Sequence, residues 1–192
     1  DTMLCPNSKN AILRSCGAGI AAADTITTVS PRYSEEIRTQ EHGCGLEAVL
    51  ENVSDRITGI TNGIDQSVWN PKTDTKLAAN YDAKSWQQGK LANKRALQQQ
   101  FALEQNNEVP MIGLVGRLAE QKGWDLILPV LRWHLRENRP TQWIVLGSGD
   151  EKFEKELRTL NEEHPDRFAL HVGFSDMLAH RIEAGSDIFV MP

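Results

Sequence analysis

An arginine and a lysine stand five residues apart, directly after an apolar run of the sequence. Residues 111–115 form the run, Arg117 and Lys122 follow it, and Gly123 precedes a helical pattern. This order predicts a strand, a tight turn and a helix start that carries two cations. A guanidinium grips a phosphate through paired hydrogen bonds, and an ammonium can follow the charge that develops on a leaving group. The pair predicts a diphosphate site, with two solvated charges at a helix start as the alternative.

A glycine turn follows the next apolar run, residues 143–146. It reads Gly147-Ser148-Gly149-Asp150, and its two glycines would let the backbone come close to a ligand. The third glycine of the dinucleotide fingerprint is missing. A plain tight turn, with Asp150 capping the next helix, is the competing interpretation.

An aromatic residue follows a third apolar run, residues 168–172. Gly173 and Phe174 come directly after it, so the ring could stack on a base or pack in the core. The carboxyl ends of parallel strands lie at one edge of a sheet, where ligands bind in open α/β folds. Two cations, a glycine turn and a ring at one edge indicate a nucleotide pocket.

Apolar strands and helices alternate through the second part of the chain. The predicted strands are 25–29, 56–60, 110–116, 143–146, 168–172 and 187–191, and the predicted helices are 8–23, 31–39, 46–52, 83–103, 122–137, 151–163 and 176–184. Continuous apolar strands separated by helices predict a parallel sheet covered on both faces. The fold class is therefore α/β and Rossmann-like, with residues before 61 forming the end of a domain.

Residues 61–80 lose all periodicity and carry repeated turn signals, which predicts a linker or interdomain crossing. Asn62 offers an amide to hydroxyl groups and Asp65 a carboxylate, although each alone is also a turn former. Trp69 is predicted to be a buried anchor. The cations of the helix that follows are predicted to form a solvated face; they are Lys84, Lys90, Lys94 and Arg95.

The composition excludes several classes of protein. A formal charge of −5 makes nucleic acid and acidic membranes poor partners, and no apolar stretch reaches the roughly 18 residues of a membrane span. The three cysteines are expected to be reduced thiols of an intracellular protein. The five histidines show no metal-ligand spacing and no Gly-x-Ser-x-Gly motif occurs, so metal enzymes and hydrolases find no support.

A series of motifs runs in order along nearly the whole chain. They are residues 23–31, Gly43-Cys44-Gly45-Leu46, Thr61-Asn62-Gly63-Ile64-Asp65, Trp69-Asn70-Pro71, Asn93-Lys94, Leu97-Gln98, Gly116-Arg117-Leu118, Gln121-Lys122-Gly123, His180-Arg181-Ile182 and Ala184-Gly185-Ser186-Asp187. In these motifs the chain resembles the ADP-glucose-dependent bacterial glycogen synthases and plant starch synthases.

The resemblance implies the GT-B fold, two Rossmann-like domains that face each other across a cleft. Residues 1–69, including the crossing, would end the N-terminal domain, and residues 70–192 would form most of the nucleotide-binding C-terminal domain. The implied reaction transfers glucose from ADP-glucose to the 4-hydroxyl at the non-reducing end of an α-1,4-glucan, with retention. ADP-glucose and the glycogen or starch acceptor would be the partners, and neither a metal nor a cofactor would be needed.

The resemblance also implies roles for single residues. Arg117 and Lys122 match the pair that binds the diphosphate and stabilises the departing ADP. Phe174 stands where the family commonly has a tyrosine beside the adenine, and Asn62 matches an asparagine near the glucosyl group. Gly173 precedes the ring, and the turn containing Gly147, Gly149 and Asp150 would lie close to the nucleotide.

Two family motifs fall outside residues 1–192: the Lys-x-Gly-Gly-Leu loop, expected before Asp1, and the acidic Ser-Arg-Phe-Glu-Pro-Cys-Gly-Leu motif, expected after Pro192. We therefore expect the chain alone to be inactive and of marginal stability. The rival interpretations are a GT-B transferase that uses a UDP- or GDP-sugar and a non-catalytic nucleotide- or glucan-binding remnant. The expected location is the bacterial cytoplasm, with the plastid stroma as the alternative.

Overall fold

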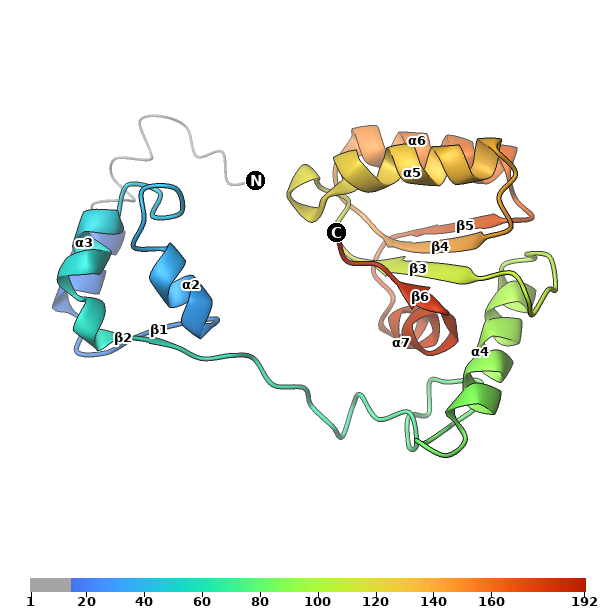
Figure 1. Cartoon of the computed structure of the whole chain (residues 1–192), viewed down its shortest axis with the longest axis horizontal. Coiled ribbons are helices and arrows are strands. Elements are labelled where there is room, and N and C mark those ends of the chain that lie inside the picture. The colour runs from blue at the N-terminus through green and yellow to red at the C-terminus, as the bar shows by residue number, and fades with distance from the viewer. Residues whose placement is uncertain (1–14) are drawn as a thin grey trace. The chain divides into compact units, whose positions relative to one another are not determined.

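The computed structural model describes residues 15–192 and divides the chain into two compact units, Asp1–Asp65 and Gln66–Pro192. Residues 15–22 are helical, whereas the first part of the predicted helix 8–23, like Cys5, lies outside the described residues. The two units are joined by residues that contain no helix or strand (Figure 1).

The first unit is built around two short parallel strands, β1 (Ile26–Thr28) and β2 (Ile57–Gly59). Its other elements are α2 (Pro31–Glu36), α3 (Glu47–Asn52) and the 3-10 turn η1 (Ser54–Arg56). The predicted start of α2 is confirmed, because the Ser30 hydroxyl accepts a hydrogen bond from the Tyr33 N–H at 3.0 Å. The helix ends before the predicted residue 39, since the following N–H groups bond three residues back instead of four.

The second unit contains a parallel sheet in the order β5-β4-β3-β6 (Figure 1). Its strands are β3 (Met111–Val115), β4 (Gln142–Gly147), β5 (Phe168–Val172) and β6 (Ile188–Phe189). Ile112 of β3 lies opposite Trp143 of β4 on one side and Ile188 of β6 on the other. Because β3 continues into β4 and β5 on one side and pairs with β6 on the other, the sheet is doubly wound.

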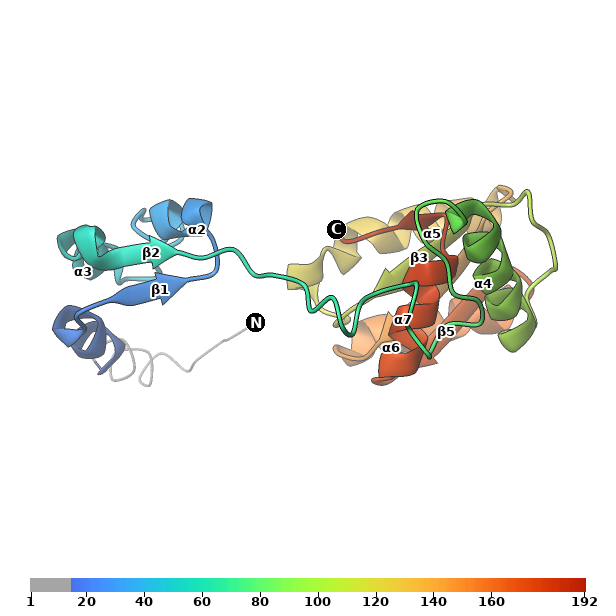
Figure 2. The same cartoon turned by 90° about the horizontal axis from the view of Figure 1, so that it is seen from below.

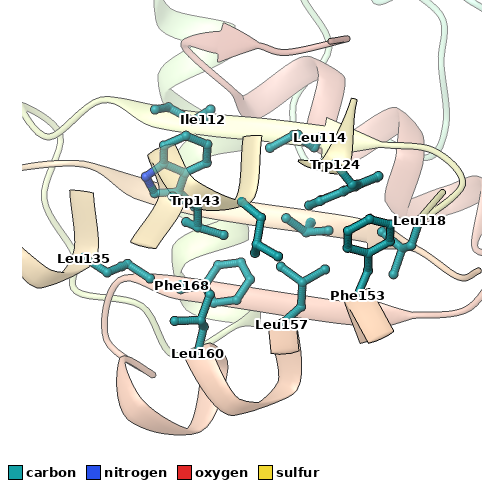
Figure 3. Packing of buried hydrophobic residues seen from close by; sticks show 13 residues of the cluster. Ile112, Leu114, Leu118, Trp124, Leu135, Trp143, Phe153, Leu157, Leu160 and Phe168 are labelled. Carbon is teal, nitrogen blue, oxygen red and sulfur yellow. The ribbon is translucent and has the colours of Figure 1, made fainter. Parts of the chain in front are cut away.

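Helices cover both faces of this sheet (Figures 1 and 2). They are α4 (Trp86–Gln100), α5 (Trp124–Arg136), α6 (Glu151–Glu163) and α7 (Asp176–Gly185). Alternate residues of β3 enter the two cores: Ile112 and Leu114 pack with α5 and α6 (Figure 3), and Met111 packs with α4 and α7. The predicted α/β class with a parallel, two-sided sheet is confirmed.

The ends of two elements differ from the prediction for local reasons. The helix α4 is shorter than the predicted 83–103, because the Asp82 carboxylate accepts the N–H groups of Lys84 and Ser85 in a turn, and Ala102 has a φ of 53°. The strand β6 is shorter than the predicted 187–191.

The solvated face predicted for α4 is wrong for two of its four cations. Lys94 is 3% exposed, and its ammonium donates to the carbonyls of Asn107 and Val109 and, at 2.7 Å, to the Asp187 carboxylate. Lys90 donates to two carbonyls at the end of α7, and burial lowers the pKa of its ammonium. Both lysines therefore fasten α4 to its neighbours, while Lys84 and Arg95 are exposed as predicted.

Trp69 is not the buried anchor that was predicted, since 39% of it is exposed. Its ring instead stacks on the imidazole of His180 in α7, with 3.7 Å between the ring centroids. Cys16 and Cys44 are free and exposed. Within residues 15–192, no helix is both long and apolar enough to cross a membrane, and no group of three His, Cys, Asp or Glu side chains could hold a metal.

Candidate functional site

The loops that follow β3 and β4 are joined to each other beyond the ends of the strands. The Leu118 N–H donates to the Ser148 carbonyl at 3.0 Å, and the Asp150 N–H donates to the Leu118 carbonyl at 2.8 Å. Leu118 and Gly149 thus form a parallel bridge. Because Leu118 is also fully buried, this bridge fixes the backbone on which Arg117 stands.

Close backbone packing explains the glycines of the turn after β4. A Cβ atom on Gly147 would lie 2.0 Å from the carbonyl oxygen of Gly116, and one on Gly149 would lie 2.4 Å from that of Leu118. The sequence pattern suggested that these glycines let a ligand approach the backbone. The structure gives another reason for them, because the neighbouring loop leaves no room for a Cβ atom at either position. Their closeness to a nucleotide stays a prediction.

Arg117 and Lys122 are exposed cations with few protein partners. The Arg117 guanidinium donates one hydrogen bond, to the Gln121 side-chain oxygen at 3.3 Å, and the Arg117 carbonyl accepts one from the Trp124 indole at 3.1 Å. Lys122 ends the 3-10 turn η2 (Glu120–Lys122), and no described residue forms a hydrogen bond or ion pair with its ammonium. Gly123, with a φ of 69°, separates this turn from α5, which therefore begins later than the predicted residue 122.

Both cations line one hollow of about 160 Å³ at the carboxyl edge of the sheet. Its other walls are the end of β3, Trp124 and the residues after β6; they are Leu114, Val115, Gly116, Trp124, Val190, Met191 and Pro192. The hollow lies at the switch point of the sheet, between β3, which is followed in the chain by β4 on one side, and β6, which pairs with β3 on the other side. Ligands of open α/β sheets bind at this point.

A second hollow, of about 240 Å³, adjoins the first, because Val115, Gly116 and Arg117 line both. Its remaining walls come from the ends of β4 and β5 and from the start of α7; they are Leu146, Gly147, Ser148, Gly173, Phe174, Ser175 and Ala179. Arg117 therefore stands between a cationic hollow and a largely apolar one. This arrangement can hold a phosphate group on one side and a flat ring on the other.

Phe174 is 91% exposed, so its packing in the core, the alternative to stacking, is wrong. It follows Gly173, whose φ is 136°. The next residue, Ser175, caps α7 by accepting the Leu178 N–H at 3.2 Å. The phenyl ring thus stands at the rim of the second hollow, open to a ligand.

Asp150 occupies the N-cap position of α6, but its carboxylate makes no capping hydrogen bond. Instead the Glu154 side chain accepts the Gly149 N–H at 2.9 Å. The predicted cap by the Asp150 side chain is wrong, and the carboxylate remains exposed near the edge. Asn62 belongs to the first unit, where it follows β2 and is exposed; its role beside a glucosyl group stays a prediction.

Sequence reasoning missed the contribution of residues 190–192 to the first hollow and of Ser175 and Ala179 to the second. The signal for both was present in the chain. Each lies at or just after the end of a predicted strand or near the start of the helix that follows, which are the positions that border the ligand edge in this fold class.

A doubly wound parallel sheet with helices on both faces and two cations at its switch point is an α/β architecture of the GT-B type. A solved structure agrees: the catalytic domain of starch synthase IV from Arabidopsis thaliana, bound to ADP and acarbose, matches with a TM-score of 0.84 and 36% identity over 92% of this chain and 36% of that one. The fold is also shared by Anabaena HepE in complex with UDP-glucose, at a TM-score of 0.58 and 15% identity over 94% of this chain and 42% of that one.

The sequence comparisons name the family. The starch synthase catalytic domain model matches residues 8–52. Glycogen synthase of Rhodopirellula baltica is 56% identical over 174 residues, and that of Aromatoleum aromaticum is 49% identical over 175 residues; each match covers 91% of this chain and 34% and 35% of the relative, respectively. Over 91% of its length the chain is thus similar to members of the glycogen and starch synthase family, and it spans about a third of the length of the curated relatives that it matches.

Proposed function

We propose that this chain supplies the nucleotide-binding part of a retaining glucosyltransferase. The enzyme transfers glucose from ADP-glucose to the non-reducing end 4-hydroxyl of an α-1,4-glucan, glycogen or starch. The observation that carries the proposal is the pair of weakly engaged cations, Arg117 and Lys122, which line one hollow at the switch point beside the hollow rimmed by Phe174.

The chemistry follows from the charges. The Arg117 fork binds diphosphate oxygens, and the Lys122 ammonium stabilises the negative charge that develops on the departing ADP. Phe174 stacks on the base. Because fixed cations provide this stabilisation, the proposed reaction uses neither a metal nor a cofactor.

A chimera tests the proposal. The segment of the Rhodopirellula baltica glycogen synthase that matches this chain is replaced by residues 15–192, and glucan extension from radiolabelled ADP-glucose is measured. We expect activity, and we expect Arg117→Ala or Lys122→Ala to lower kcat about 100- to 1000-fold, as the loss of single electrostatic donors does.

The matched control is Lys155→Ala, which removes an exposed cation of α6 and should leave kcat within about twofold. A chimera that folds but whose activity is as sensitive to Lys155→Ala as to Lys122→Ala would contradict the proposed role. An active chimera that tolerates both site substitutions would favour a binding remnant in this segment.

Competition among nucleotides tests the choice of donor. ADP should inhibit the chimera at concentrations at least about tenfold below those of UDP and GDP. A preference for UDP or GDP would instead indicate a transferase that uses the corresponding sugar donor.

The proposed location is the bacterial cytoplasm, with the plastid stroma as the alternative, because the donor and the growing glucan are made and stored there. Immunodetection in fractionated cells checks it. Signal in an exported fraction would contradict both locations.

A further inference from the structure

The crossing between the two units has two parts that differ in how they are held. Every residue from 61 to 69 is exposed, and the division between the units falls within this stretch. Residues 70–80 contain no helix or strand either, yet many of their polar groups are bonded to α4, to α7 or to one another. The change occurs at Trp69, whose ring lies on His180 at an interplanar angle of 9°.

His180 lies at the centre of the contacts with α7, and it is 2% exposed. Its Nδ1 is 2.6 Å from the Asp74 carboxylate, and its Nε2 is 3.0 Å from the Lys76 ammonium. An ammonium can only donate, so Nε2 accepts, and the ring proton sits on Nδ1 and is donated to Asp74. One imidazole thus joins the Asp74 carboxylate and the Lys76 ammonium while it stacks on Trp69.

Lys76 extends this contact to the first turn of α7. Its ammonium is 2.5 Å from the carboxylate of Asp176, the first residue of the helix, and its carbonyl accepts a hydrogen bond from Arg181 at 2.9 Å. Asp176 directly follows Ser175, which lines the apolar hollow. The fastened segment therefore reaches the wall of the candidate nucleotide site.

The helix α4 holds the other end of the segment. The Asn93 side chain, 1% exposed, accepts the N–H groups of Ala78 and Ala79 and donates to the Ala79 carbonyl at 2.7 Å. The Asn80 amide donates to two carbonyls within the segment, those of Pro71 and Asp74. Residues 70–80 are thus bonded to both α7 and α4, within the second unit.

We propose that His180 is a positioning residue that fastens residues 69–80 to α7, and that bending between the two units is confined to residues 61–68. The hinge is then eight residues long, and the segment after it moves with the nucleotide-binding sheet. Hinges are short loop segments that absorb backbone rotation, whereas a segment bonded at both ends cannot do so without breaking those bonds. The proposal concerns the mechanics of this chain and holds whatever its donor sugar.

Amide hydrogen exchange of the whole 192-residue chain tests the proposal. In the unaltered chain, the bonded N–H groups of residues 70–80 should exchange at least about tenfold more slowly than the N–H groups of residues 61–68. His180→Phe keeps a ring on Trp69 but removes both polar bonds, so it should raise exchange in residues 70–80 about tenfold or more. The α5 and α6 helices should be unaffected.

Two further variants separate positioning from general stability. His180→Gln can donate to Asp74 and accept from Lys76, so it should recover part of the protection that His180→Phe loses. His171→Phe, which changes an exposed histidine of β5, should leave residues 70–80 as they are.

The proposal is wrong if residues 61–68 are as protected as residues 70–80 in the unaltered chain. It is equally wrong if His180→Phe leaves residues 70–80 protected. Should His180→Phe unfold the sheet, seen as lost protection in α5 and α6, Asp74→Asn takes its place. It preserves side-chain volume and weakens the bonds that the Asp74 carboxylate forms with His180 and with the Lys76 N–H. Unchanged protection of residues 70–80 in that variant would then overturn the proposal.

Discussion

Cations meet two different environments in the second unit, at the carboxyl edge of the sheet and between α4 and α7. Lys122 has no protein partner among the described residues and Arg117 has one weak contact, whereas the Lys94 ammonium has three acceptors. Lys122 and Lys94 are the same type of residue, and charge alone does not separate them. Their partners separate them. A cation whose hydrogen bonds are all made within the protein stabilises the fold, whereas a cation with few protein acceptors remains available to a ligand.

Desolvation explains the contrast. A buried ammonium loses its hydrogen bonds to water and must replace them with bonds to the protein. The Lys94 ammonium accordingly donates to three protein acceptors. An exposed guanidinium stays hydrated and can exchange that water for the oxygens of an anionic ligand. Substitutions should therefore separate the two regions, with stability lost in one and ligand chemistry lost in the other.

The largest effect on stability is expected for Lys94→Met. This change leaves two carbonyls and the Asp187 carboxylate without the ammonium, so the free energy of unfolding should fall by about 3 kcal/mol or more. Urea unfolding followed by circular dichroism measures it. Lys84→Met, an exposed lysine just before the same helix, is the control and should change it by less than about 0.5 kcal/mol. An equal loss of unfolding free energy in Lys94→Met and Lys84→Met would contradict the distinction between the buried, hydrogen-bonded lysine and the exposed one.

A pair of glycine substitutions tests how rigid the ligand edge is. Gly147→Ala would place a methyl group 2.0 Å from the Gly116 carbonyl, whereas a Cβ on Gly116 itself meets nothing within 4 Å. We expect the first to cost about 1–3 kcal/mol by overpacking and the second to be near neutral. Thermal unfolding of both variants checks this. If Gly147→Ala left the unfolding temperature unchanged, the loops after β3 and β4 could move apart without a loss of stability.

The stability that the contacts of residues 69–80 with α7 provide should also depend on pH. Burial alone would raise the pKa of Asp74, but its bonds with the Lys76 N–H and with His180 lower it, and the bond with Lys76 lowers the pKa of Asp176. A carboxyl whose folded pKa lies below its ordinary value of 3.8 stabilises the folded state fully above that value. This stability is lost as the pH falls through the lowered folded pKa.

Urea midpoints measured from pH 7 down to pH 3 should therefore fall toward the acid end. The fall should be smaller in Asp74→Asn, which carries no carboxyl to protonate. An identical pH profile for the two proteins would show that this cluster contributes nothing to the acid sensitivity.

The smallest effect on stability is expected at the candidate site itself. Arg117→Ala and Lys122→Ala remove exposed cations with few partners, so each should shift the free energy of unfolding by no more than about 0.5 kcal/mol. The measurement is the same urea titration. A loss of 2 kcal/mol or more at Lys122 would assign it a structural role and weaken its proposed part in binding ADP.

Much of the sheet could be predicted because its strands and helices carry strong local signals. The bounds of α6 and β5 match the prediction, and Ser30 and Pro31 marked the start of α2. Phe174 and Arg117 were placed at one edge because both directly follow strands of a predicted parallel sheet. In each case the deciding physics is local periodicity, capping or the parallel arrangement of strands.

The remainder depends on partners that are distant in the chain. The burial of Lys94 depends on Asp187, 93 residues later, and the stacking of Trp69 depends on His180. Periodicity cannot report such pairs, because a lysine on the polar side of a helix looks the same whether water or a carboxylate faces it. The close packing of Gly147 against Gly116 was likewise hidden.

The bridge between Leu118 and Gly149 has a consequence for binding kinetics. Since the loop that carries Arg117 is already ordered by its bonds to the next loop, little conformational entropy would remain to be lost on binding of the proposed nucleotide. Association should then follow a single fast phase without a slow ordering step. Backbone positions from 116 to 118 with and without nucleotide should agree to within about 1 Å, as in preorganised complexes.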